Sequence, residues 1–177
     1  MTSDEQLRQI IQFSKSAPIE PLEAASHVEK HFAITLPATL KRIHRLGGGS
    51  SVKVYVDEEW SGCDLHALVT NPFEHYGTDI LTAHERLLAQ LDQCRAAFRR
   101  VIPFAQDGAG AQFCLDYRTQ EDPLVAKCDW DYQLLARSFD EFLTHALPEK
   151  RPLWTLPPNA ISEHEHQQFL SLLPEYW

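Results

Sequence analysis

The sequence lacks the features that mark several special classes of protein. It contains no CxxC pair, because its four cysteines, Cys63, Cys94, Cys114 and Cys128, lie far apart, whereas structural zinc sites and thioredoxin-like motifs usually need such a pair. No apolar run approaches the roughly 18 residues of a membrane span. With 44% hydrophobic and 23% charged residues, the composition is that of an ordinary globular protein. Membrane-spanning, collagenous and fully disordered classes are therefore excluded.

A basic leader is also missing from the start of the chain. The first residues, MTSDEQLRQIIQF, carry acids where a secretory signal would carry positive charge, and no apolar signal segment follows. We therefore expect a cytoplasmic protein, or one of an equivalent reducing compartment. A chain of 177 residues buries roughly 70% of its unfolded surface on folding. One domain with a short appendage is thus expected, without a disulfide or metal to hold it together.

Positive charge is scarce relative to negative charge. The chain has 25 Asp and Glu against 16 Lys and Arg, a formal net charge of -9. The excess is concentrated in residues 47–85 and 101–147. Such a field repels a phosphate backbone and attracts a cationic partner, so direct binding to nucleic acid is disfavoured. For any single acid, solvated surface remains the simpler interpretation.

Apolar periodicity predicts three helices before the first strand. The first carries apolar residues from Leu7 to Phe13, the second begins at Glu20, and the third covers residues 38–46 and ends at a run of three glycines. From Ser51 the period changes to two, which indicates a strand. The order of elements changes at this point from helices to mainly strands.

The remaining strands are expected to follow one another through short turns. A second strand is predicted around residues 65–69, and a helix of about four turns follows from a Thr82 cap to Phe98. The run VIPFAQDGAGAQFCLDY predicts two strands joined at Asp107-Gly108, LVAKCDW predicts a further strand, and Ser138 is expected to cap a last domain helix. The predicted class is α+β, with a mainly antiparallel sheet flanked by helices.

The predicted domain covers residues 1–147. Residues 148–177 form a proline-rich connector and a final helix, which carries apolar residues such as Phe169 and Leu172 and is expected to dock back on the domain.

No residue pattern indicates a catalytic, metal or cofactor site. His27 and His31 share a helical spacing but lack an obvious third ligand, and the glycine run before Ser50 lacks the GK[ST] of a phosphate-binding loop. Ser138 lacks the GxSxG context of a nucleophile. Cys114 alternates with apolar neighbours, so we expect it to be a small buried hydrophobe. We predict a protein without enzymatic activity and without a cofactor.

Three segments carry more specific patterns. FAITLPATLKRIHRLGGGS passes through LP into a helix and a glycine cluster, VIPFAQDGAGAQFCLDY forms a central hairpin, and VAKCDWDYQLLARSFDEFL ends in an SF-EFL pattern. In this order, over Leu36 to Leu147, they resemble the SUKH superfamily. This group includes fungal cell-wall-synthesis regulators and many bacterial polymorphic-toxin immunity proteins.

The resemblance implies a single SUKH-like α+β domain that acts by binding and has no catalytic residues. In bacterial members this means capture of a toxin domain delivered by a neighbouring cell. Leu46 stands where the family often has Asn, and residues 57–98 and 148–177 have no family counterpart that we can align. Partner specificity could therefore reside in these segments.

The expected partner is a cognate toxin domain, with a basic nuclease as one candidate, bound by a monomer or homodimer that contacts neither nucleic acid nor membrane. The segment DEEWSGCD combines four acids with one Trp outside the resemblance, and loops of this kind can vary in specificity without disturbing a core. The predicted contacts are Asp57, Glu58, Glu59, Trp60 and Asp64, with a second group of Asp116, Asp129, Trp130 and Asp131. Two other functions stay open: a regulatory scaffold or adaptor of the same fold, and a small hydrolase that uses His and Asp residues brought together in space.

Overall fold

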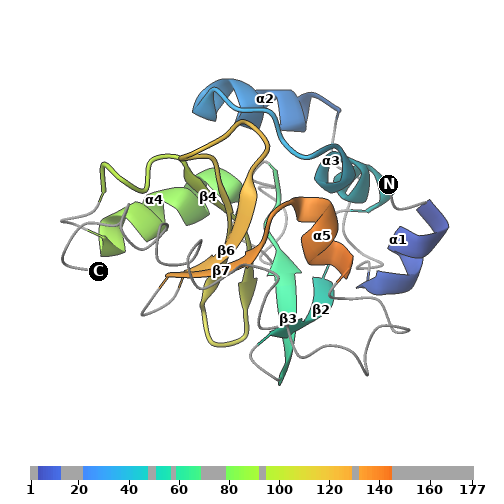
Figure 1. Cartoon of the computed structure of the whole chain (residues 1–177). Coiled ribbons are helices and arrows are strands. Elements are labelled where there is room, and N and C mark those ends of the chain that lie inside the picture. Colours follow the sequence, from blue (N-terminus) through green and yellow to red (C-terminus); the bar gives the residue numbers. More distant parts are fainter. Residues whose placement is uncertain are drawn as a thin grey trace.

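The computed structural model describes residues 4–12, 22–47, 51–56, 59–68, 79–91, 95–128 and 132–144. Its helices are α1 (Asp4–Ile10), α2 (Leu22–Phe32), α3 (Ala38–Leu46), α4 (Ile80–Gln90) and α5 (Phe139–Thr144). Its strands are β1 (Ile11–Gln12), β2 (Ser51–Val56), β3 (Glu59–Leu65), β4 (Val101–Asp107), β5 (Gln112–Asp116), β6 (Leu124–Cys128) and β7 (Tyr132–Ala136). Within these residues, the strands form one seven-stranded antiparallel sheet in the order of the sequence (Figure 1).

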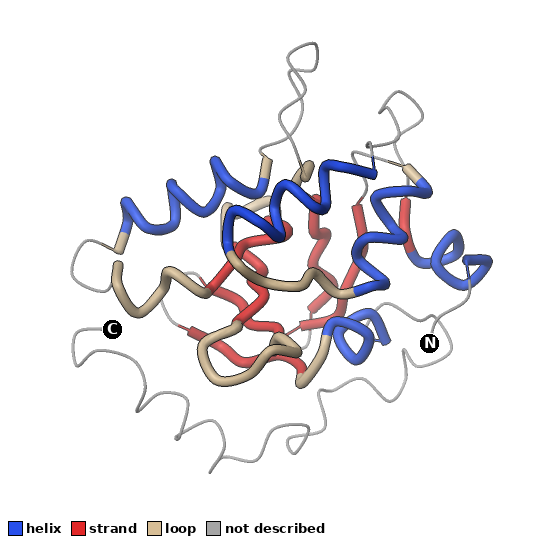
Figure 2. The backbone as a smooth tube through the Cα atoms, turned by 90° about the horizontal axis from the view of Figure 1, so that it is seen from above, coloured by secondary structure: helices blue, strands red, loops and turns tan. Residues whose placement is uncertain are grey.

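Helices surround the sheet (Figure 2), and the buried apolar residues form two clusters. The larger cluster joins one face of the sheet to α1, α2, α3 and α5, and includes Phe104, Phe113 and Phe142. The smaller cluster lies on the opposite face, where Leu87 and Leu88 of α4 cover β5, β6 and β7. Burial on both faces explains why the central strands have nearly continuous apolar sequences. The predicted α+β class with an antiparallel sheet is confirmed.

Several predicted boundaries are correct. Helix α3 begins and ends where the apolar spacing predicts, and α2 begins two residues after Glu20. The hairpin at Asp107-Gly108 is present between β4 and β5. Ser138 caps α5, since its Oγ accepts a hydrogen bond from the backbone N–H of Glu141 at 3.1 Å. These features depend on local sequence signals, which single-sequence patterns report well.

Other boundaries were wrong. The first helix ends at Ile10, and Ile11 begins β1 because it pairs with Val52 of β2. The second long strand, predicted around residues 65–69, lies at Glu59–Leu65 instead. Helix α4 ends at Gln90 rather than near Phe98, and its N-cap is Asp79, whose carboxylate accepts the N–H of Thr82 at 2.9 Å.

Strand β7 was missed because its sequence, YQLLA, has no alternating pattern. Residues on both of its faces are buried, including Tyr132 and Leu134 in the smaller cluster and Leu135 in the larger one. A short apolar run of this kind cannot be assigned to a strand or a helix by periodicity alone. The predicted connector and final helix, residues 148–177, lie outside the described residues.

The connection between α2 and α3 is held by one carboxylate. Oε1 of Glu29 accepts hydrogen bonds from the backbone N–H of Leu36 at 2.9 Å and from Nζ of Lys41 at 2.8 Å. At the end of α2, Ala33 has a φ of 53° and the N–H of Ile34 donates to the carbonyl of Glu29 at 3.1 Å. This is the left-handed helix ending that glycine usually provides.

His84 connects α4 to its neighbours. The residue is 7% exposed, and its ring packs edge-on against Phe32 of α2 with the ring centroids 4.8 Å apart. Burial lowers the pKa of His84 from 6.5, and the charge of His31 adds to this effect, whereas backbone hydrogen bonds with Phe98 and Arg99 and the charge of Glu85 oppose it. The folded protein therefore favours the neutral imidazole.

The positive φ at Ala33 predicts a stabilising substitution. Ala33→Gly should raise the free energy of unfolding by about 1 kcal/mol, because glycine adopts this conformation without the clash of a Cβ atom. Ala89→Gly is the matched control, since Ala89 is exposed within α4 and the same change there should lower stability by about 1 kcal/mol. Urea denaturation of both variants measures the two effects. Equal destabilisation by both changes would contradict the assignment.

The lowered pKa of His84 predicts loss of stability in acid. The unfolded chain binds the proton more strongly, so the free energy of unfolding should fall as the pH drops below 6.5 and towards the lower pKa of the folded state. Denaturation of the parent and of His84→Gln at about pH 7.5 and about pH 5.5 should show a smaller pH dependence in the variant. His27→Gln, which changes an exposed histidine, should keep the pH dependence of the parent.

Candidate functional site

The β2–β3 ribbon extends beyond the end of β4. Strand β3 pairs with β2 from Glu59 to Asp64, but it pairs with β4 only at Cys63, Asp64 and Leu65. At Asp107, opposite Cys63, the chain turns away from β3 towards β5. The outer half of the ribbon therefore carries much of the acidic segment past the edge of the main sheet (Figure 1).

The predicted contacts on this ribbon are only partly described. Asp57 and Glu58 lie outside the described residues, as do Asp129, Trp130 and Asp131 of the second group. Glu59, Trp60 and Asp64 belong to β3, and the side chain of Asp64 is exposed. The segment expected to be a loop is thus partly a strand.

A polar row continues from Asp64 across the sheet. Asp64 of β3 pairs with Gln106 of β4, and Gln106 pairs with Gln112 of β5. Asp64 is exposed and the two glutamines are half-buried. Facing residues of paired strands share one face of a sheet, so the row forms a continuous polar strip. Neither glutamine was predicted from the sequence, because the row exists only through the strand register.

The Gln112 end of the row is held rigidly. Nε2 of Gln112 donates to the carbonyl of Gly110 at 3.1 Å, so its Oε1 is left to face Nε2 of His66 at 2.9 Å. Because that oxygen can only accept, Nε2 of His66 carries the proton. His66 is 2% exposed. It therefore supports the strip from below rather than forming part of the accessible surface.

The turn between β4 and β5 is ordered by its own aspartate. Oδ1 of Asp107 accepts the backbone N–H groups of Ala109 and Ala111, both at 2.9 Å. Gly110 has a φ of 96°, which favours glycine. Lys127 Nζ lies 3.9 Å from Asp107 Oδ2. The expectation of a hairpin turn rather than a ligand loop agrees with this bonding, which uses the carboxylate within the turn itself.

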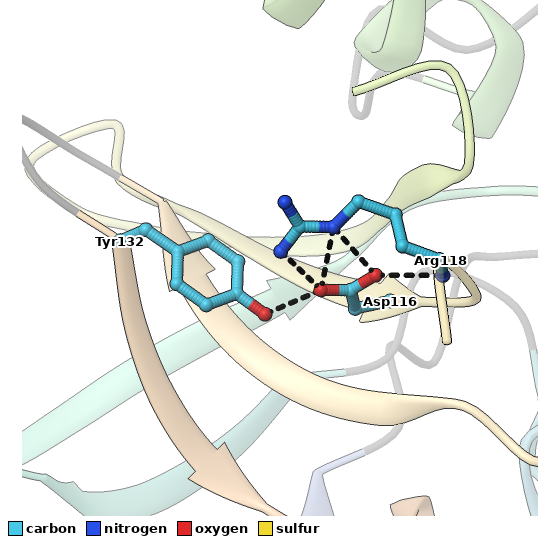
Figure 3. Close-up of polar contacts among 3 residues, drawn as sticks. All are labelled: Asp116, Arg118 and Tyr132. Carbon is cyan, nitrogen blue, oxygen red and sulfur yellow. Dashed lines mark hydrogen bonds and ion pairs between the residues drawn. The ribbon is translucent and has the colours of Figure 1, made fainter. Parts of the chain in front are cut away.

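Asp116 does not lie on the surface, so the prediction that it contacts a partner was wrong. It is fully buried at the end of β5, on the face covered by the smaller cluster. Its carboxylate accepts the phenol of Tyr132 at 2.5 Å, Nη2 of Arg118 at 2.6 Å, and the backbone N–H of Arg118 at 2.9 Å (Figure 3). A carboxylate with these donors is satisfied internally and is unavailable to a partner.

Arg118 is enclosed by aromatic rings as well as by the carboxylate. Its Cζ lies 5.3 Å from the ring centroid of Phe98 and 4.9 Å from that of Tyr132, within the range of cation–π attraction. Burial alone would lower the pKa of Arg118, but the hydrogen bonds and charge of Asp116 raise it. Burial and the same carboxylate raise the pKa of Tyr132. We call Asp116, Arg118 and Tyr132 the buried charge cluster.

The cysteines and histidines of the described residues form no reactive site. Cys63, Cys114 and Cys128 are free and buried, which confirms the prediction for Cys114. Burial raises the pKa of both Cys63 and Cys114, which disfavours the thiolate form. His27 and His31 are exposed on α2. Among the described residues, no group of three or more His, Cys, Asp or Glu is placed to hold a metal ion.

Comparison with known proteins identifies one family. The model described as the SMI1 / KNR4 family (SUKH-1) matches residues 22–145, which is more than two thirds of the chain. No curated protein and no solved structure matches the chain. In the described part of the chain, no helix has the length and apolar character needed to cross a membrane.

The buried charge cluster predicts a graded response to substitution. Tyr132→Phe removes one donor from Asp116 and should lower the free energy of unfolding by about 1–3 kcal/mol. Asp116→Ala leaves the guanidinium of Arg118 buried without its counter-charge and should cost about 3–5 kcal/mol.

Urea denaturation measures both changes. The double variant Asp116→Leu with Arg118→Met is the control, since it removes both charges and should be more stable than Asp116→Ala alone. A loss below about 1 kcal/mol in Asp116→Ala would mean that the cluster contributes as weakly as a surface ion pair.

Proposed function

The chain belongs to the SMI1 / KNR4 family (SUKH-1), and from this premise we propose that it is an immunity protein that binds and neutralises a cognate toxin domain. Its action is binding alone, without a reaction of its own. The expected location is the cytoplasm, where a delivered toxin acts. The family membership and the exposed polar strip with its acidic ribbon support this proposal.

The single observation that carries the proposal is the position of Asp64. It is exposed at the junction between the polar strip and the projecting ribbon, and the segment around it, residues 54–85, contains no Lys or Arg. Acids at such an edge attract a cationic surface and raise its rate of association. A toxin with a basic substrate cleft, such as a nuclease, fits this charge.

The contrast between the two sets of acids narrows the binding surface. Asp116 uses its charge inside the protein, whereas Asp64 has no hydrogen bond or ion pair to another described residue and directs its charge to solvent. We therefore assign the toxin contact to the ribbon and the polar strip. Asp129, Trp130 and Asp131 stay in the proposal as a neighbouring contact from the connection between β6 and β7.

Charge reversal on the ribbon tests the proposed function. The protein is co-expressed with the product of the gene directly upstream, and growth and binding kinetics are measured. Asp64→Lys, alone or with Glu59→Lys, should slow association by roughly tenfold at low salt and flatten its salt dependence. Glu121→Lys is the control, because Glu121 is exposed in the β5–β6 connection and the net charge changes equally.

Two results would overturn the proposal. If the parent protein gives no protection against the upstream product and does not bind it, the immunity function fails and a scaffold binding an endogenous protein is the better assignment. If Asp64→Lys and Glu121→Lys slow association equally, only overall charge matters and the contact lies elsewhere.

A further inference from the structure

The outer half of β3 has one edge without a neighbouring strand among the described residues. Glu59, Trp60, Ser61 and Gly62 pair with β2, but the pairing with β4 begins only at Cys63. We call the backbone of residues 59–62 the open edge. Unpaired edges of this kind are ready to accept another extended chain.

The direction of the backbone groups on β3 follows from one hydrogen bond. The N–H of His66 donates to the carbonyl of Phe104 at 2.8 Å. Because backbone groups alternate in direction along a strand, the even-numbered residues of β3 direct their N–H and C=O groups towards the side of β4. For Gly62 and Trp60 this is the side where β4 has already turned away.

The space beside the open edge contains little bulk. The β4–β5 turn next to it consists of Gly108, Ala109 and Gly110, all exposed. A Cβ atom added to Gly108 would meet no heavy atom within 4 Å. Asp107 holds this turn in a single bonded form. An incoming strand would therefore lie beside a fixed turn without displacing large side chains.

We propose that the open edge binds an extended, Lys- and Arg-rich segment of the partner by strand addition, with the N–H and C=O groups of Trp60 and Gly62 forming the new backbone ladder. Charge selects the segment, because Asp57, Glu58, Glu59 and Asp64 surround the edge in the sequence without an intervening base. Backbone pairing supplies affinity in this mode of recognition, and side chains supply specificity. Only the identity of the partner as a toxin rests on the proposed function.

The test uses a peptide of alternating Lys and Val, about eight residues long, as a generic cationic strand. Binding is followed by amide chemical shifts and hydrogen exchange in the full chain. Saturating peptide should protect the amides of Trp60 and Gly62. The same peptide with its Lys amides N-methylated, or with Glu in place of Lys, should bind at least about tenfold more weakly.

A substitution isolates the backbone donor. Gly62→Pro removes the outward N–H and leaves the ladder with β2 in place, because that N–H faces away from β2. Binding of the Lys–Val peptide should weaken by about tenfold or more, whereas Gly62→Ala should stay within about twofold of the parent. If the Pro variant does not fold, the N-methylated peptide still decides the question. Absence of binding, or binding insensitive to N-methylation or to Gly62→Pro in the folded variant, overturns the strand-addition mode.

The failure of this inference can be told apart from failure of the proposed function. If the parent neutralises the upstream product and the folded Gly62→Pro protein does so equally well, the immunity function stands and the open edge is not the contact. If the Lys–Val peptide binds and protects Trp60 and Gly62 but no toxin is neutralised, the edge stands and the partner belongs to another class.

Discussion

A carboxylate buried under α4 constrains half of this protein. Asp116 is fully enclosed, and its charge can be kept there only if Arg118 and Tyr132 both reach it. Arg118 follows β5, Tyr132 begins β7, and Phe98 comes from the segment before β4. The cluster thus fixes β5, β7 and the 95–100 segment relative to one another. The smaller apolar cluster, which includes Leu87 and Leu88, packs on that face.

This constraint separates the two faces and the two ends of the sheet in their roles. Over β5, β6 and β7 the face opposite the main core is covered by apolar residues of α4 and closed around the charge cluster. Over β3, β4 and the start of β5 the same face carries Asp64, Gln106 and Gln112, which are exposed or half-buried. Stability is concentrated at one end, and the accessible polar strip lies at the other. The match to the family model covers both ends.

The parts of the structure that follow from local sequence were predictable, and the parts that follow from register were not. Helix α3 is marked by its apolar spacing and by the glycines after Leu46, and the β4–β5 hairpin is marked by Asp107-Gly108. Strand β3 was placed too late because Glu59, Ser61 and Gly62 have little strand preference, and pairing with β2 outweighs it. Asp116 has the same parity as Cys114, which was expected to be buried, and the Arg two positions later was a signal for an internal pair. Gln106 and Gln112 could not be assigned to the site, since their alignment with Asp64 appears only when the strands are paired.

The order of strands has a consequence for how the chain folds. Each strand pairs with its predecessor in the sequence, so β4, β5, β6 and β7 can assemble through contacts between near neighbours, which favours rapid formation. Strand β3 meets β4 only after the chain has passed through α4, and it is joined there by three residue pairs, against five between β4 and β5. The seam between β3 and β4 is therefore the natural boundary between two cooperative units. Opening at this seam would release the ribbon as a unit while the charge cluster stays closed, which lets the acidic end adapt its position without unfolding the rest.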